Sequence, residues 1–575
     1  MRILLLAHSF NSLSQRLWVE LADWGHEVSL ELDVNDSVTN DAVRRWSPDV
    51  VIAPFLKRAI PESVWRAVRC LVVHPGIRGD RGPSALDWAV QESPPRWGVT
   101  VLQANAEMDA GDVWASVEFD MRAASKGSLY RNEVTEAAVA AVRIALERIE
   151  TGEQPTPLRD LTDARGKLRL PMRQADRAID WQRDPTDLVL RKLRAADGTP
   201  GVADDVLGLR VHCYDAHPEA ALRGNAGEII AQRDGAICRA TRDGAVWITH
   251  LKDSEDPDRP FKLPAAMVLG DRLQAVPVKK LAIDAPHSTQ TWREIRYEEQ
   301  GEVGVLHFAF YNGAMSTAQC ERLTAAYREA ARRPTRVIVL AGGPDFWSNG
   351  IHLNVIEASS QPAEESWRNI NAIDDFVLAV LTTQTHLTVA ALQGNAGAGG
   401  VFIALAADRV LARSGIVLNP HYKGMGNLYG SEYWTYLLPK RAGPEGARAI
   451  TEGRMPMGTR EALQRGLIDG RFGASPPDFL ARVIEEARSM AREDFAERLA
   501  DKRRTREADE ARKPLAVYRA EELARMKLNF FGFDSSYHVA RHNFVRRVPK
   551  ARTPSYLARH RALSAKAAQS PQQPT

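Results

Sequence analysis

Three signals are scarce in this 575-residue chain, and each scarcity excludes a class of protein. The 4 cysteines are scattered without a CxxC pair, so the sequence indicates neither a disulfide framework nor a zinc site. No apolar run reaches the roughly 18 residues that a membrane-spanning helix needs. The net charge is only +3, and no basic stripe marks a surface for nucleic acid. We therefore expect a cytoplasmic protein with no metal, no membrane span and no nucleic-acid partner.

The length and the hydrophobic pattern point instead to several α/β domains. One hydrophobic core cannot serve a chain of this length, and roughly two to four domains are expected. Near the start, apolar runs alternate with helical patterns, which predicts a Rossmann-like domain with a doubly wound parallel sheet over residues 1–158. Its expected strands are 2–7, 26–32 and 48–54, and its expected helices are 13–25, 41–46 and 137–152, the first capped by Ser12 or Ser14.

Two irregular stretches divide the rest of the chain. After a charged linker at 159–171, short strands separated by Asp-Gly turns predict a small OB-like β-barrel over residues 172–280, which we interpret as a structural module. A second linker is expected at 283–291, then a third α/β domain over 292–548, and a flexible tail over 553–575. In the third domain the expected strands are 303–310, 337–341 and 387–392, and the expected helices are 316–332, 477–493 and 514–528.

The first candidate site follows an apolar strand that ends at His74. A loop rich in glycine, proline and arginine comes next, and Asp109 stands in an Asp-x-Gly turn further on. An imidazole and a carboxylate that converge over a carbonyl suit one-carbon acyl transfer. A histidine hydrogen-bonded to backbone at a strand end is the structural alternative for His74 taken alone.

This region resembles the folate-dependent formyltransferases. The matching elements, in chain order, are His74, Arg81–Gly82, Trp88–Ala89, Gly98–Thr100 and Asp109–Gly111. The resemblance implies N10-formyltetrahydrofolate as the formyl donor, with His74 and Asp109 catalytic and Arg81 and Gly82 in the binding loop.

Two departures from the formyltransferase pattern matter for the chemistry. Val72 replaces the family's asparagine, whose amide helps to hold the oxyanion, and the loop from His74 to Arg81 is one residue shorter. Asn11 is our candidate for the missing amide. Loss of that donor is expected to slow transfer or to move the role to another group.

A second candidate site lies in the third domain. A Phe-x-x-Gly turn ending at Gly350 and a glycine cluster at 394–400, followed by Ala-Asp408, resemble the crotonase (enoyl-CoA hydratase/isomerase) family. The resemblance implies that backbone N–H groups of Ile351 and Gly399 hold an acyl-CoA thioester oxygen, with Gly350 and Gly400 beside them. Close packing of helix against strand is a structural reason for the glycines that holds in addition.

The departures from the crotonase pattern exclude hydration. One hydratase glutamate falls on Phe402 and the other on Pro420–His421, so water addition is not expected. Tyr422 and Glu432 are the remaining acid–base candidates; a buried tyrosine and a solvated glutamate at a helix start are the structural alternative. Arg546 is our candidate for a CoA phosphate ligand, against a basic face that simply lies in solvent.

The two domains together resemble the HypX (HoxX) family of nickel–iron hydrogenase maturation factors over nearly the whole chain. That resemblance implies formyl transfer from N10-formyltetrahydrofolate to coenzyme A, followed by decarbonylation of formyl-CoA, with hydrogenase maturation proteins as possible partners. The carbon monoxide would become a ligand of the hydrogenase iron.

Other functions stay open from the sequence alone. One is a formyltransferase for an amine, such as tRNA or an amino sugar, with an inert crotonase domain. Another is a non-enzymatic scaffold that binds CoA. Formate as the product, in place of carbon monoxide, would indicate a formyl-CoA hydrolase.

Overall fold

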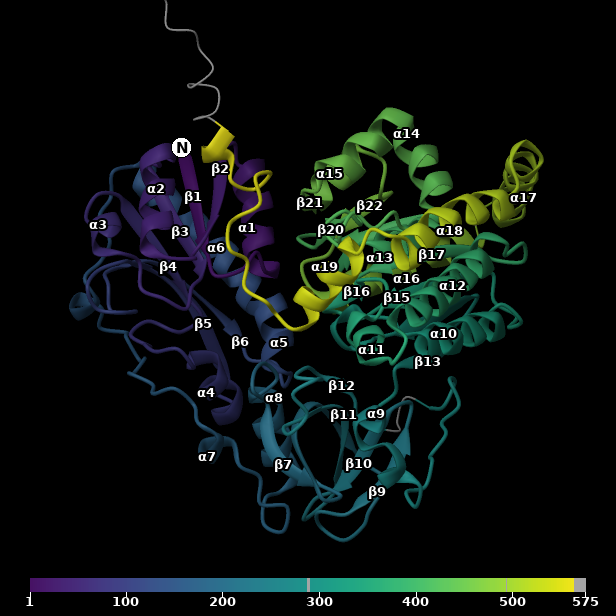
Figure 1. Ribbon diagram of the computed structural model, residues 1–575, viewed down its shortest axis with the longest axis horizontal. Coiled ribbons are helices and arrows are strands. Elements are labelled where there is room, and N and C mark those ends of the chain that lie inside the picture. The colour runs from purple at the N-terminus through teal and green to yellow at the C-terminus, as the bar shows by residue number, and fades with distance from the viewer. Residues whose placement is uncertain (287–289, 493, 563–575) are drawn as a thin grey trace, which may run out of the picture.

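Three lobes, two with one β-sheet and the third with two, make up the computed structural model, which describes residues 1–286, 290–492 and 494–562 (Figure 1). Part of the second predicted linker, residues 287–289, lies outside the described residues. None of the helices among the described residues is long and apolar enough to cross a membrane. The first and third lobes lie side by side, and the second lies beneath both in the view of Figure 1.

The first lobe is a six-stranded sheet in the order β2-β1-β3-β4-β5-β6. Along β1, Ile3 and Leu5 enter one core, and Leu4 and Leu6 enter the core on the other face, so helices cover both sides. Its strands are β1 Arg2–Ala7, β2 Glu27–Leu32, β3 Val50–Phe55, β4 Arg69–His74, β5 Arg96–Gln103 and β6 Val113–Asp120. Its helices are α1 Ser12–Asp23, α2 Asp36–Trp46, α3 Glu62–Trp65, α4 Ala85–Glu92, α5 Lys126–Leu129, a π-turn at Tyr130–Val134 and α6 Thr135–Glu150.

Two details of this lobe differ from the sequence prediction. The sheet is not wholly parallel, because β4 pairs antiparallel with β5 and β5 antiparallel with β6. Helix α1 is capped by Asn11, whose side chain accepts from the Ser14 N–H, and not by Ser12 or Ser14. Asparagine is as good a cap as serine, so residue type could not decide between neighbours.

The second lobe is an antiparallel sheet in the order β7-β8-β11-β10-β9, with β12 paired to β11. Its strands are β7 Val202–Val206, β8 Leu209–Glu219, β9 Ile229–Arg233, β10 Ala236–Ala240, β11 Ala245–Asp253 and β12 Leu263–Pro264. Short helices α7 Gln174–Arg177, α8 Thr186–Ala195 and α9 Ala265–Leu269 accompany it, with 3-10 turns at Leu158–Asp160 and Gly270–Leu273. The OB-like description of this lobe stays a prediction.

The third lobe contains two sheets, in the orders β13-β14-β15-β17-β19-β22 and β16-β18-β20-β21. Its strands are β13 Ile295–Gln300, β14 Val303–Phe308, β15 Val337–Gly342, β16 Phe346–Ser348, β17 Leu387–Leu392, β18 Asn395–Gly397, β19 Arg409–Arg413, β20 Val417–Asn419, β21 Met457–Gly458 and β22 Gly470–Phe472. Its helices are α10 Thr317–Ala330, α11 Leu353–Ala358, α12 Pro362–Leu381, α13 Gly399–Leu405, α14 Trp434–Gly453, α15 Thr459–Gln464, α16 Pro476–Arg492, α17 Phe495–Arg512, α18 Leu515–Phe531 and α19 Ser536–Val545, with a 3-10 turn at Tyr311–Gly313. Glycine-rich turns join the small sheet to α13, and the second candidate site forms there.

The segment after α19 contradicts the predicted flexible tail. It leaves the third lobe and packs along β2 of the first, where the Leu30 N–H donates to the Leu557 carbonyl (Figure 1). His560 and Arg561 both contact the buried Glu31 carboxylate, His560 Nε2 at 2.8 Å and Arg561 Nη2 at 2.9 Å. Residues 563–575 of the predicted tail lie outside the described residues.

Glu31→Gln should loosen this C-terminal segment from the first lobe. Breaking a buried ion pair by removing one partner typically costs about 3–5 kcal/mol, and we expect a loss in free energy of unfolding of that order. Glu27→Gln is the control, because Glu27 lies on the same strand with its side chain 73% exposed. Urea denaturation followed by tryptophan fluorescence measures both; equal effects of the two substitutions would contradict the assignment.

The same contact predicts a pH dependence. Burial opposes ionisation of Glu31, but the hydrogen bonds from His560 and Thr553 and the nearby Arg561 charge outweigh it and lower the pKa of Glu31. A carboxyl whose pKa is lowered by folding stabilises the fold fully above its ordinary pKa, and that contribution is lost as pH falls through the folded value. Wild type should therefore lose its stability advantage over Glu31→Gln in acid.

Candidate functional site

His74, the last residue of β4, lies between two carboxylates. Its Nε2 is 3.1 Å from Asp80 Oδ1, and its Nδ1 is 3.6 Å from Asp109 Oδ2. His74 and Asp80 are buried, and Asp109 is partly buried. The structure thus brings together His74 and Asp109, as the sequence analysis expects, and adds Asp80, which that analysis missed.

Asp80 is fixed by an arginine from the charged stretch between the first two lobes. Arg169 Nε lies 2.8 Å from Asp80 Oδ2, and a second nitrogen of the same guanidinium lies 2.8 Å from Glu92. Residues 159–171 are therefore more than a spacer, because they supply the counter-ion of a group that holds His74. An acidic residue inside the Gly-Asp-Arg-Gly loop was the available sequence signal for Asp80.

Glycines let this loop approach the imidazole. A Cβ at Gly76 would lie 2.4 Å from His74 Nε2, so no side chain fits there. Gly82 has φ +110°, and its N–H donates to Asp109 Oδ2 at 3.3 Å, which ties the loop to the second carboxylate. The neighbouring Arg81 pairs at 2.5 Å with Glu107, on the loop that also carries Asp109.

Asn11 is occupied elsewhere. Its Oδ1 accepts from the Ser14 backbone and its Nδ2 donates to the Tyr130 hydroxyl at 3.2 Å. Among the described residues no hydrogen bond joins Asn11 to His74 or Asp109. Asn11 therefore caps a helix in this structure, and its proposed replacement of the amide lost at Val72 has no geometric support.

The second constellation forms where β16 and α13 meet. Gly350 has φ +76°, and a Cβ there would lie 3.5 Å from the Gly399 nitrogen, so the two turns are adjacent. The Gly350 carbonyl accepts from the Met315 N–H, which fixes the turn that presents the Ile351 N–H. At Gly400 a Cβ would lie 2.0 Å from the Ser348 carbonyl, so this glycine is required for close packing.

Glu432 points at this pair of turns. A Cβ at Gly399 would lie 2.0 Å from Glu432 Oε1, so the carboxyl fills the space that the glycine leaves. The Tyr422 hydroxyl donates to Glu432 Oε2 at 2.5 Å, and the Ser431 N–H donates to the same oxygen at 3.0 Å. Glu432 is 1% exposed, so the alternative of a solvated glutamate is wrong.

Burial sets the electrostatics of this pair. Burial raises the pKa of Glu432 to about 8, and the neighbouring Asp374 carboxylate adds to the shift. Burial and the Glu432 charge also raise the pKa of Tyr422 well above its ordinary value. Phe402, at a hydratase glutamate position by the resemblance, is fully buried and stacks on Tyr422 with ring centroids 5.2 Å apart.

Arg546 lies apart from this pair. It donates to the Asp258 carbonyl at 2.5 Å and lies 3.8 Å from Glu357. Its proposed contact with a CoA phosphate stays a prediction.

The lobes that carry the two constellations are in direct polar contact. Asn419 Nδ2, at the end of β20, donates to Gln15 Oε1 of α1 at 2.9 Å. The buried Arg413 of β19 donates to Asn132 Oδ1 at 3.1 Å. These contacts fix the orientation of one lobe against the other.

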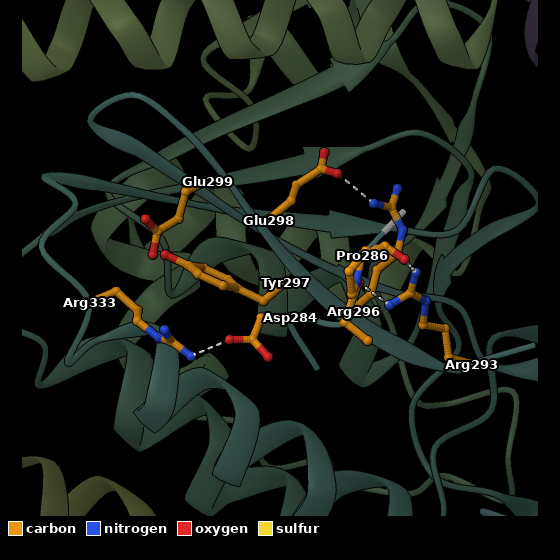
Figure 2. A pocket seen from close by; sticks show the side chains of 9 residues that line it. Asp284, Pro286, Arg293, Arg296, Tyr297, Glu298, Glu299 and Arg333 are labelled. Carbon is orange, nitrogen blue, oxygen red and sulfur yellow. Dashed lines mark hydrogen bonds and ion pairs between the residues drawn. The ribbon is translucent and has the colours of Figure 1, made fainter. Parts of the chain in front are cut away.

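Two hollows on the surface lie away from both constellations. Figure 2 shows one of about 390 Å³ beside β13, in which Arg296 pairs with Glu298 and Arg333 with Asp284. A second hollow of about 650 Å³ lies along α2. Within the described ranges, no cluster of three or more His, Cys, Asp or Glu residues could hold a metal ion.

Comparison with known families finds a match for each of the three lobes. Three family models match in order: formyl transferase at residues 30–145, formyl transferase C-terminal domain at 171–258, and enoyl-CoA hydratase/isomerase at 302–522. A methionyl-tRNA formyltransferase from Dechloromonas aromatica is 24% identical over 43% of this chain and 80% of its own length.

Two further matches span nearly the full length. The hydrogenase maturation factor HoxX from Bradyrhizobium diazoefficiens is 56% identical over 98% of this chain and 97% of its own. A crystal structure of HypX from Aquifex aeolicus in complex with tetrahydrofolic acid is 51% identical, with a TM-score of 0.94, and covers 98% of this chain and 99% of that chain. The α/β class with formyltransferase and crotonase-like lobes is thereby confirmed, and the chain belongs to the HoxX/HypX family of hydrogenase maturation factors.

Proposed function

We propose that this chain transfers a formyl group from N10-formyltetrahydrofolate to the thiol of CoA in its first lobe and decarbonylates formyl-CoA in its third. The observation that carries the proposal is the Glu432 carboxyl, buried against Gly399 where an acyl thioester oxygen is expected. A relative crystallised with tetrahydrofolic acid supports folate in the first step. The hydrogenase name of the full-length relative supports carbon monoxide as a ligand supplied to the hydrogenase iron.

In the first step the CoA sulfur attacks the formyl carbon, the carbon–nitrogen bond to folate breaks, and the thiol proton ends on the folate nitrogen. His74 moves that proton. Its Nδ1 side is where the reacting groups enter, because the 3.6 Å contact with Asp109 is looser than the 3.1 Å contact with Asp80. Asp80 holds the ring, and Asp109 supports the positive charge that forms on it.

In the second step the N–H groups of Ile351 and Gly399 hold the formyl oxygen. The formyl carbon gives up its proton to the Tyr422–Glu432 pair, the carbon–sulfur bond breaks with its electrons on sulfur, and the pair returns a proton to the thiolate. The products are carbon monoxide and CoA. The pair takes up one proton and gives back one proton, so the step needs no exchange with solvent and suits a buried pair.

Exclusion of water separates decarbonylation from hydrolysis. Phe402 covers one face of Tyr422, and Tyr422 itself is 6% exposed. With an apolar ring at a hydratase glutamate position, no carboxylate there activates water. Formyl-CoA held at this site should therefore lose carbon monoxide faster than it yields formate.

Substitution of His74 or Asp109 should slow CoA formylation. In a Tyr422→Phe background that retains formyl-CoA, His74→Ala should slow CoA formylation by about 10²-fold or more, as expected for loss of a general acid–base. Asp109→Asn should also slow it, whereas Asp112→Asn, an exposed residue three positions along the same loop, should not. Formyl-CoA is measured by chromatography. Unchanged formylation in His74→Ala would exclude this assignment.

The second step is tested with formyl-CoA supplied directly. Tyr422→Phe and Glu432→Gln should each lower carbon monoxide release by about 10²-fold or more, because the pair moves both protons. Tyr429→Phe is the matched control, since Tyr429 lies in the same loop with 37% exposure. Carbon monoxide is trapped on reduced haemoglobin. Formate as the main wild-type product would make the third lobe a hydrolase.

A further inference from the structure

Two buried carboxylates outside the proposed Tyr422–Glu432 pair converge on the turn that carries Glu432. Asp374 comes from α12 and Glu522 from α18, and both are fully buried. The Ser431 hydroxyl lies between them, 2.7 Å from Asp374 Oδ2 and 3.4 Å from Glu522 Oε2. Neither residue matches a motif of the formyltransferase or crotonase resemblance.

Both carboxylates accept backbone N–H groups of this turn. Asp374 Oδ1 accepts from the Glu432 N–H at 2.8 Å. Glu522 accepts from the Tyr433 N–H at 2.9 Å and from the Thr435 N–H at 2.8 Å. Two helices that are distant in sequence therefore hold one short stretch of backbone.

The turn needs such support because its conformation is unfavourable. Glu432 and Tyr433 have φ of 62° and 58°, two successive non-glycine residues in the left-handed region. L residues with side chains rarely adopt this conformation, and it persists only where surrounding contacts fix it. The same turn aims the Glu432 carboxyl at Gly399.

Little positive charge lies near the three buried carboxyl groups of Asp374, Glu432 and Glu522. Arg519 Nε lies 3.7 Å from Asp374, while its Nη1 pairs with Asp375 at 2.7 Å. The other titratable groups that act on Glu432 or feel its charge are Tyr422, Glu522 and the buried thiol of Cys320. Arg519 lies beside Asp374, and three neighbouring buried carboxyl groups with so little positive charge near them cannot all be ionised.

We propose that Asp374 and Glu522 are positioning residues for the second step, which fix the backbone turn of Glu432 and hold its carboxyl against Gly399. The inference rests on the proposed function for the role of Glu432 in decarbonylation. The positioning of Glu432 by Asp374 and Glu522 does not depend on that function, because it follows from the hydrogen bonds of the turn.

The pKa directions agree with this role. Burial, with contributions from the other carboxylates, raises the pKa of Asp374 to about 6 and that of Glu522 to about 8. Burial thus disfavours ionisation of each carboxyl group, and the adjacent Arg519 favours the charged form of Asp374. A Glu432 pKa near the working pH favours a group that must first accept a proton and then return it.

An infrared titration tests the inference without turnover. The carbonyl band of protonated Glu432, identified by its loss in Glu432→Gln, should be present at neutral pH in the full chain. Asp374→Asn removes a like charge, so the pH midpoint of this band should fall by about one unit. Asp375→Asn is the matched control, because Asp375 is the next residue, shares Arg519, and has a side chain 54% exposed. An unmoved midpoint in Asp374→Asn would overturn the proposal.

Carbon monoxide release from formyl-CoA provides the second readout. If ionised Glu432 accepts the formyl proton, the rising limb of the pH–rate profile should move to lower pH in Asp374→Asn and in Glu522→Gln. CoA formylation in the first lobe should be unchanged in both variants, and a circular dichroism spectrum like that of wild type confirms that the third lobe folds. Should one of them fail to fold, the other gives the same reading.

The outcomes separate the inference from the proposed function. No carbon monoxide from wild type, together with a shifted infrared midpoint, would remove the proposed function and leave the positioning of Glu432 in place. Carbon monoxide from wild type with unshifted midpoints and limbs would overturn the inference alone.

Discussion

A carboxyl group buried without a dedicated cation must be held by N–H and O–H donors, and this constraint organises the third lobe. Glu432 meets it through the Tyr422 hydroxyl and the Ser431 N–H. It fits only because residue 399 has no side chain. Phe402, stacked on Tyr422, keeps solvent from the pair. The glycine cluster therefore makes space for the Glu432 carboxyl, besides packing helix against strand.

The first candidate site differs from the second, because charged groups surround its imidazole. Asp80 and Asp109 flank His74, and Arg169 neutralises the more deeply buried carboxylate. Because Arg169 belongs to the stretch that joins two lobes, the site depends on their packing. The Gln15–Asn419 contact and the C-terminal segment along β2 join the first and third lobes in the same way. The proposed transfer of a reactive formyl thioester from one lobe to the other would require such a fixed arrangement.

The sequence predicted local strands and motifs, but not contacts between residues that are far apart in the chain. The strands 2–7 and 387–392 coincide with β1 and β17, because short apolar runs between turn signals specify buried strands. Motif order made His74, Asp109, Gly399 and Glu432 candidates, and their catalytic roles stay predictions. Asp374 and Glu522 could not be found, because they act through backbone N–H groups 58 and 89 residues away. The docking of residues 553–562 on the first lobe was not predicted, because the partner Glu31 lies more than five hundred residues earlier in the chain.

The proposed function requires one chain to turn a folate-bound formyl group into carbon monoxide. The most direct measurement supplies the purified full chain with N10-formyltetrahydrofolate, isotopically labelled in the formyl carbon, together with unlabelled CoA, and traps the gas on reduced haemoglobin. We expect labelled carbonyl-haemoglobin that depends on CoA, with little labelled formate. Label that never reaches CoA, or that leaves only as formate, would contradict it.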